Sequence, residues 1–317
     1  MKHKRLPSKK TAKKSKKRIF LLVKITLIGL ILFFMLQKLY SSWDKVSSYR
    51  FRFNLFSLIT SLILVIIGFA MFSRVWAKIL LKMRIKLGYL KAYNIWSKSQ
   101  MFKYVPGLVW IALSRAYICE KEGIKKRNTV ISVILENMLM VLSASILSIY
   151  FILINLKVTR TGIIYLIIII AGLSAIHPKV FNLLINIALR IFKLKKISLK
   201  LNYLDVLGLL SNYVFIWIIM GSGFYFFSNS IYPISFKLLP YFVSVFSFAW
   251  ATGFIIVFIP GGLGVREGLI SILIRDIVSV PIAIVIAFSA RIWWMFGEAS
   301  SFVISSSLRK IGRKSRL

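Results

Sequence analysis

The chain has 317 residues, of which 58% are hydrophobic and 17% are charged, and its mean hydropathy is +0.80. This composition excludes an ordinary soluble domain, in which about 25% of residues are charged, and indicates a protein that lies in lipid. Net charge is +37, from 45 Lys and Arg against 8 Asp and Glu. Because the basic residues stand beside apolar segments, membrane topology and anionic headgroups explain them better than nucleic-acid binding does.

Apolar segments near the roughly 20 residues that cross a bilayer recur along the chain. We predict an all-α integral membrane protein with six full spans, at residues 19–39, 54–72, 129–153, 162–176, 204–227 and 281–307. Residues 1–18 hold ten Lys or Arg and no acid, like the start of a signal peptide. The apolar run after them is too long and lacks a small-residue cleavage site, so we expect an uncleaved first span.

Three regions are therefore expected: a basic, disordered cytoplasmic tail (1–18), a membrane domain (19–308) and a second basic cytoplasmic tail (309–317). The positive-inside rule places the basic stretches at 121–127 and 179–200 on the same side, the latter with an amphipathic helix. It also places there a connection after the second span that holds Arg74, Lys78, Lys82, Arg84, Lys86 and Lys91. The prediction is a multi-pass protein of the cell (inner) membrane with both termini cytoplasmic.

Two segments, residues 93–118 and 241–274, are broken by Pro106-Gly107 and by Pro260-Gly261-Gly262. Because both termini are expected on the same side, the number of full spans must be even. We therefore predict that each of these two segments enters and leaves the membrane on one side, so that they form two re-entrant helical hairpins of opposite orientation. They lie about half a chain apart and each precedes an arginine, Arg115 or Arg266. Opposed broken helices mark substrate sites in transporters with inverted repeats. The alternative is that two Pro-Gly pairs are coincidental kinks.

The second break is rich in glycine. Gly261, Gly262 and Gly264 permit positive φ, so that successive N–H groups can form an anion-binding nest at the start of the following half-helix. Arg266 can clamp a phosphate there with two parallel hydrogen bonds. The alternative is that these glycines only let helices pack closely.

Three acids fall inside or beside the predicted apolar segments: Glu136, Glu267 and Glu298. A charge near the bilayer centre costs about 2.5–3.5 kcal/mol, so these residues are not expected to face lipid. They either pair across helices with Arg115, Arg266 and Arg291, or they line a polar cavity for a headgroup or a proton relay. Most of the tryptophans near predicted boundaries or breaks are expected to be interface anchors, namely Trp43, Trp76, Trp96 and Trp110.

Catalytic and metal chemistry has little support. The only cysteine is Cys119, and the two histidines, His3 and His177, lie far apart, so we predict no disulfide, metal site or cofactor. No Ser-His-Asp set or nucleotide loop appears, so an intramembrane enzyme that uses Glu267 is the weakest hypothesis.

The broken segments resemble two signatures of a known family. The first covers Lys103-Tyr104-Val105-Pro106-Gly107, Val109-Trp110, Ser114-Arg115 and Lys121-Glu122-Gly123. The second is Pro260-Gly261-Gly262-Leu263-Gly264-Val265-Arg266-Glu267-Gly268, and the segment from Arg291 to Glu298 is similar to the closing one. The resemblance, over about residues 19–307, is to the transmembrane flippase-like domain of lysylphosphatidylglycerol synthases.

In the two-part relatives, the multiple peptide resistance factors, this domain is held to move aminoacylated phosphatidylglycerol to the outer leaflet, and a soluble domain makes that lipid. The chain ends at Leu317 with no room for the soluble domain, so we expect no lysyl-lipid synthesis. The resemblance implies lipid translocation, with the headgroup held in a polar cleft by Pro106, Gly107, Arg115, Gly261, Gly262, Gly264, Arg266 and Glu267.

The cargo stays open among an anionic phospholipid, an aminoacylated phospholipid and a lipid-linked sugar. Stand-alone relatives often lie beside glycosyltransferases, so the alternative function is a membrane scaffold that supports such an enzyme. The sequence also leaves open whether the protein is a homo-oligomer.

Overall fold

The structure, a computed structural model, describes residues 37, 40, 53–104, 110–155, 178–191, 202–255 and 264–314. These residues form helices, turns and connections, with no strand among them. Five of the helical segments are long and apolar enough to cross a membrane. The protein is therefore an all-α integral membrane protein, as predicted.

Four long helices match predicted spans: α3 (Leu55–Lys82), α6 (Lys126–Asn155), α9 (Tyr203–Ile231) and α12 (Val280–Lys314). The fifth candidate span, Phe236–Ile255, consists of a short 3-10 helix and α10 (Leu239–Ile255). The predicted spans at 19–39 and 162–176 lie outside the described residues, as does His177. The helix expected in the basic loop is present as α8 (Pro178–Ile191).

The end of α3 corrects one prediction. Arg74, Lys78 and Lys82 were placed in a connection, but they lie on the helix, which continues to Lys82. Residues such as Val75 and Ile79 are buried beside the exposed Arg74 and Lys78. Buried and charged residues thus lie on opposite faces of the last turns of α3, so that one face packs in the core while the charged face stays accessible.

The two broken segments contain short helices. The first comprises α4 (Tyr89–Gln100), a 3-10 helix (Met101–Tyr104) and α5 (Trp110–Glu120), and the second has α11 (Val265–Ile274) after α10. The breaks, at 105–109 and 256–263, lie outside the described residues, and with them Pro106, Gly107, Pro260, Gly261 and Gly262. At 10 to 12 residues, α4, α5 and α11 span only about 15–18 Å. They are too short to cross hydrocarbon of about 30 Å, whereas the re-entrant course itself stays a prediction.

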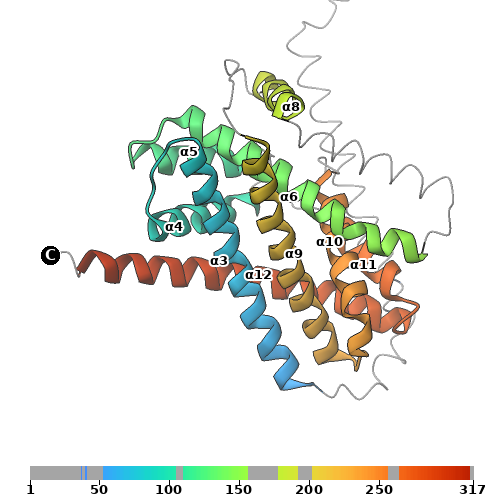
Figure 1. The fold of residues 1–317 in the computed structure, drawn as a ribbon. Coiled ribbons are helices and arrows are strands. Elements are labelled where there is room, and N and C mark those ends of the chain that lie inside the picture. The colour runs from blue at the N-terminus through green and yellow to red at the C-terminus, as the bar shows by residue number, and fades with distance from the viewer. Residues whose placement is uncertain are drawn as a thin grey trace, which may run out of the picture.

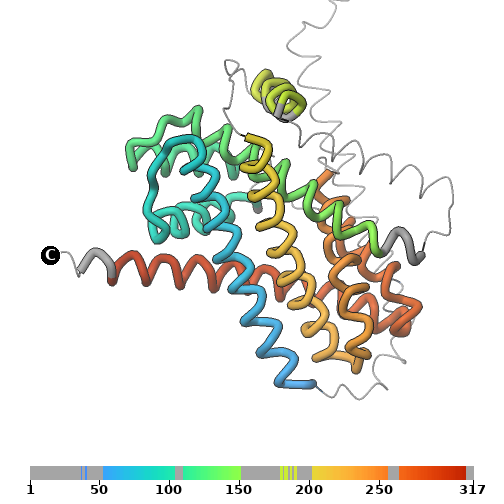
Figure 2. Tube along the Cα trace, in the orientation of Figure 1, coloured from blue at the N-terminus to red at the C-terminus, as the bar shows by residue number. Residues whose placement is uncertain are grey.

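In space, α3 and α9 run side by side and α12 crosses behind them (Figure 1). One end of α12 packs against α11, and its C-terminal part packs against α4. The two groups of short helices thus lie toward opposite ends of α12, as the tube view makes clear (Figure 2). The helix α12 therefore contacts both α4 and α11, which lie about half a chain apart in the sequence.

Glycines allow the long helices to approach closely. A Cβ on Gly68 of α3 would lie 2.1 Å from the sulfur of Met220 on α9, and one on Gly297 of α12 would lie 2.7 Å from Val65 on α3. Such contacts are typical of helix packing in membranes, where small residues bring backbones together. On the outer side of α3, Ile59, Ile63 and Ile67 are exposed at a four-residue spacing, as expected of a face toward lipid.

Candidate functional site

A cavity of ≈ 30 Å³ lies between α10, α11 and α12. Space of this size holds about two water molecules. Its lining combines aromatic and apolar side chains with three charged ones, namely Phe246, Ala249, Trp250, Arg266, Glu267, Ile270, Ala287, Ala290, Arg291 and Trp294. The predicted residues Arg266, Glu267 and Arg291 thus meet at one hollow within the bundle.

Arg266 is held against α10. Its guanidinium carbon lies 5.1 Å from the centroid of the Trp250 ring, which is a cation–π distance. The side chain also runs across Gly253, where a Cβ would lie 2.6 Å from Cγ of Arg266. Nothing in the sequence points to Gly253, because a glycine inside an apolar helix gives no signal of what packs against it.

Glu267 has two local roles. One carboxylate oxygen accepts a 2.7 Å hydrogen bond from the N–H of Gly264, and the other lies 4.0 Å from Nε of Arg291. Gly264 has φ of 81°, a conformation that favours glycine. The N–H of Gly264 is therefore already engaged by Glu267 at the start of α11.

A second ion pair stands beside the cavity. Nζ of Lys103, from the first broken segment, contacts Oε1 of Glu298, which also accepts a 2.8 Å hydrogen bond from Nε1 of Trp294. Trp294 lines the cavity, and the Lys103 ammonium lies 5.5 Å from its ring centroid. Pairing of Glu298 with Arg291 was one of two alternatives, and the structure shows Lys103, in the 3-10 helix Met101–Tyr104, as a partner of Glu298.

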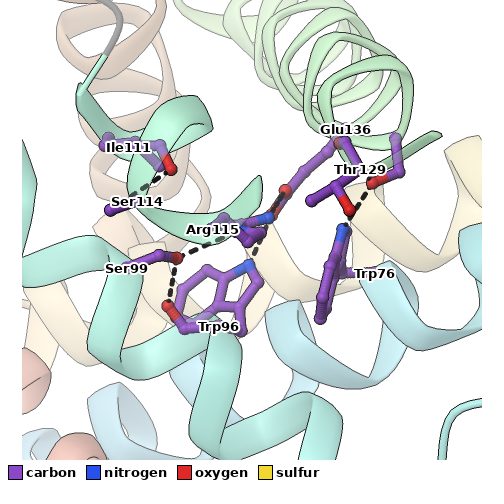
Figure 3. A network of polar contacts seen from close by, with 9 residues as sticks. Trp76, Trp96, Ser99, Ile111, Ser114, Arg115, Thr129 and Glu136 are labelled. Carbon is purple, nitrogen blue, oxygen red and sulfur yellow. Dashed lines mark hydrogen bonds and ion pairs between the residues drawn. The ribbon is translucent and has the colours of Figure 1, made fainter. Parts of the chain in front are cut away.

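Arg115 and Glu136 form a separate network (Figure 3). Nη1 of Arg115 binds the Glu136 carboxylate, and Nε donates a 2.9 Å hydrogen bond to Ser99. Nε1 of Trp96 donates to the other Glu136 oxygen at 2.5 Å, and the Arg115 guanidinium lies 4.8 Å from the Trp76 ring centroid. Every one of these side chains is buried.

This network has two consequences for the predictions. Neither Arg115 nor Glu136 lines the cavity, so the structure does not bring Arg115 together with Arg266. Their mutual pairing agrees with the structural alternative for these charges. The prediction that Trp76 and Trp96 are interface anchors was wrong, since they are 0% and 2% exposed and pack in the core.

The charges around the cavity favour an anion. Arg266, Arg291 and Lys103 supply three positive charges, while Glu267 and Glu298 supply two negative ones. Because the cavity is surrounded by apolar side chains of low dielectric constant, this excess of positive charge attracts anionic groups. Within the part of the chain that the structure describes, no group of His, Cys, Asp and Glu could hold a metal ion.

Comparison with known proteins does not assign the chain to a family. No family model matches the chain, and no curated protein matches it. The likeness to the flippase-like domain therefore rests on the sequence motifs alone.

Proposed function

We propose that the protein moves an anionic lipid between membrane leaflets and holds its headgroup at the cavity between α10, α11 and α12. The observation that carries this proposal is that two arginines from different helices, Arg266 and Arg291, line one hollow inside an apolar bundle. Guanidinium groups bind phosphate with two parallel hydrogen bonds, which makes arginine the preferred residue for such headgroups. The acyl chains stay in the bilayer throughout.

The size of the cavity bears on the mechanism. About 30 Å³ accommodates water but not a complete headgroup. Arg266 rests on the Trp250 ring and Arg291 lies only 4.0 Å from Glu267. Binding a phosphate therefore requires these side chains to turn toward it, and the phosphate then replaces the contact between Arg291 and Glu267.

Ion pairs bring several of the basic segments together, which supports the proposed orientation with the termini in the cytoplasm. Arg309 near the end of α12 and Lys91 at the start of α4 both bind Glu122, which lies between α5 and α6. Lys82 at the end of α3 binds Asp205 at the start of α9. These segments are the ones that the positive-inside rule places in the cytoplasm, in agreement with a cell-membrane protein whose termini face that side.

The test uses purified protein in vesicles of phosphatidylcholine and phosphatidylglycerol that carry a fluorescent phosphatidylglycerol probe. Bleaching of the outer leaflet reports the transfer rate. We expect the double variant Arg266→Gln, Arg291→Gln to lose at least 90% of the transfer seen with the unchanged protein. The control is Arg275→Gln, because Arg275 directly follows α11, is exposed and does not line the cavity.

If the unchanged protein moves no probe, lipid translocation is refuted for this headgroup class. If the double variant moves the probe as fast as the control does, the cavity is not the site. A fluorescent phosphatidylcholine probe shows whether the arginines select an anion, since only the anionic probe should depend on them.

A further inference from the structure

A polar stripe runs along one face of α12. Its members follow one another at intervals of three or four residues, which places them on the same side of the helix: Arg291, Trp294, Glu298, Ser301, Ser305 and Arg309. The stripe extends over about 27 Å of helix axis. Its inner members, Glu298, Ser301 and Ser305, are at most 3% exposed.

The stripe meets polar side chains of α4. Ser301 donates a 3.0 Å hydrogen bond to the hydroxyl of Tyr93, and the Oγ atoms of Ser97 and Ser305 lie 2.7 Å apart. Asn94 accepts from Arg309 at 2.9 Å. We call this contact between α4 and α12 the polar seam, and it is buried on both sides, since Tyr93, Asn94 and Ser97 are also at most 3% exposed.

Charged groups lie at both ends of the polar seam. At one end, Lys103 and Glu298 form the ion pair beside the cavity. At the other, Arg309 joins Glu122 and Lys91 at the predicted cytoplasmic face. Polar side chains of α12 thus connect that face with the cavity.

The remaining surface of α12 has a different chemistry. Gly297 and Trp293 pack against apolar side chains of α3 and α9, and Ile292 and Val303 are exposed as if toward lipid. Packing of one helix on another needs no continuous polar face, because each interhelical hydrogen bond in a membrane contributes little to the association. Hydroxyl contacts exchange readily for water or headgroup oxygens, whereas an apolar contact gains nothing from such a partner.

We propose that the polar seam is the path by which the lipid headgroup passes between the cytoplasmic leaflet and the cavity, with α4 and α12 separating to admit it. This inference rests on the proposed lipid transfer. Headgroup oxygens take over the hydrogen bonds of Tyr93, Ser97, Ser301 and Ser305 in turn. The Lys103–Glu298 pair closes the inner end until the phosphate reaches Lys103.

A reversible cross-link tests whether the polar seam must open. In a Cys119→Ala background, which removes the only native thiol, the variant Ser97→Cys, Ser305→Cys places two thiols where the hydroxyl oxygens are 2.7 Å apart, close enough for a disulfide. We expect transfer of the fluorescent phosphatidylglycerol to be at least fivefold slower after oxidation than after reduction of the same sample.

The matched control ties α3 to α9. In Leu64→Cys, Gly223→Cys the two Cβ atoms start 3.3 Å apart, near the separation that a disulfide needs. We expect oxidation of this variant to change transfer less than twofold, because it does not cross the polar seam.

The outcomes separate the two proposals. Equal transfer by the oxidised and reduced Ser97→Cys, Ser305→Cys protein overturns the path but leaves lipid transfer standing, as does an equal slowing of the control. Absence of transfer by the Cys119→Ala parent overturns both.

A second pair of variants covers failure of the disulfide to form. Ser301→Ala, Ser305→Ala removes two buried hydroxyls from the polar seam. Ser143→Ala, Ser228→Ala removes two buried hydroxyls whose hydrogen bonds, among the described residues, go to carbonyls of their own helices. We expect the first variant to transfer the probe at least threefold more slowly than the second, at similar melting temperatures. Equal rates contradict the path.

Discussion

Lys103 and Glu298, whose side chains are 13% and 2% exposed, form an ion pair although 195 positions separate them in the chain. Lys103 belongs to the first broken segment and Glu298 to the last long helix. The same Glu298 oxygen accepts a hydrogen bond from Trp294, whose ring lines the cavity. The pair therefore links the position of the first broken segment to the candidate site.

Replacing Lys103 should strongly destabilise the protein. Lys103→Met leaves the buried Glu298 carboxylate without its ammonium partner, and breaking a buried pair costs about 3–5 kcal/mol. Adding Glu298→Gln should recover part of that loss, because the amide carries no charge. The control is Lys82→Met, which removes a lysine that is 46% exposed in its pair with Asp205 and should cost less than about 1 kcal/mol. Thermal unfolding in detergent measures all three, and similar melting temperatures for the two single variants would contradict the expectation.

The Arg115 network should behave as a structural unit. Arg115→Met is expected to lower the free energy of unfolding by about 3 kcal/mol or more, since the buried Glu136 carboxylate then loses its guanidinium partner and the Trp96 ring loses its cation–π contact. Lys126→Met is the comparison, because Lys126 and Glu120 form an exposed pair at 3.0 Å. Its effect should stay within about 0.5 kcal/mol. The lipid transfer rate per folded molecule should not depend on Arg115, and a selective loss of transfer would instead place Arg115 in the headgroup site.

Gly253 should be needed to position Arg266. In Gly253→Ala the new Cβ meets Cγ of Arg266 at 2.6 Å, so the arginine must move away from Trp250. We expect a loss of about 1–3 kcal/mol from overpacking together with slower transfer of the anionic probe. Gly208→Ala is the control, because nothing lies within 4 Å of the added atom and alanine favours a helix by about 0.5–1 kcal/mol. Unchanged melting and transfer in Gly253→Ala would show that Arg266 does not depend on this contact.

Glu122 should make stability depend on pH in the acid range. Burial raises the pKa of this carboxyl, but the hydrogen bonds from Lys91 and Arg309 and their positive charges outweigh it, so the pKa lies below its ordinary value of 4.5. A depressed carboxyl pKa means that the stabilisation is complete above the ordinary value and is lost as the pH falls through the folded-state pKa. The melting temperature of Glu122→Gln should therefore differ from that of the unchanged protein at pH 7, and the two should converge only as the pH falls through the lowered folded-state pKa of Glu122, below 4.5. Glu120→Gln, at a carboxyl that is 52% exposed, should show a smaller difference, and parallel curves for Glu122→Gln would refute the role of the pair.

The long helices were predictable because hydropathy and helix signals are local. The span expected at 204–227 is the core of α9, whose start is marked by Asn202 and by Asp205, which accepts the N–H of Asn202. The end of α3 was not found, because charged residues on one face of a helix look like a basic loop when their buried neighbours are not considered. The tryptophans were misplaced for a similar reason: an amphipathic ring suits an interface, but in this bundle Trp96 stacks on Phe72 and binds Glu136.

By itself the sequence determined that this chain is an all-α membrane protein and where the central parts of α3, α6, α9 and α12 lie. Only the tertiary structure decided which charges meet: Glu267 with Arg291, Glu298 with Lys103, and Arg115 with Glu136 in a network away from the cavity. The physical reason is that a membrane-spanning helix is recognised from the hydropathy of its own consecutive residues. The partner of a buried charge depends instead on how helices distant in the sequence cross. Several arrangements of the helices are compatible with the same hydropathy.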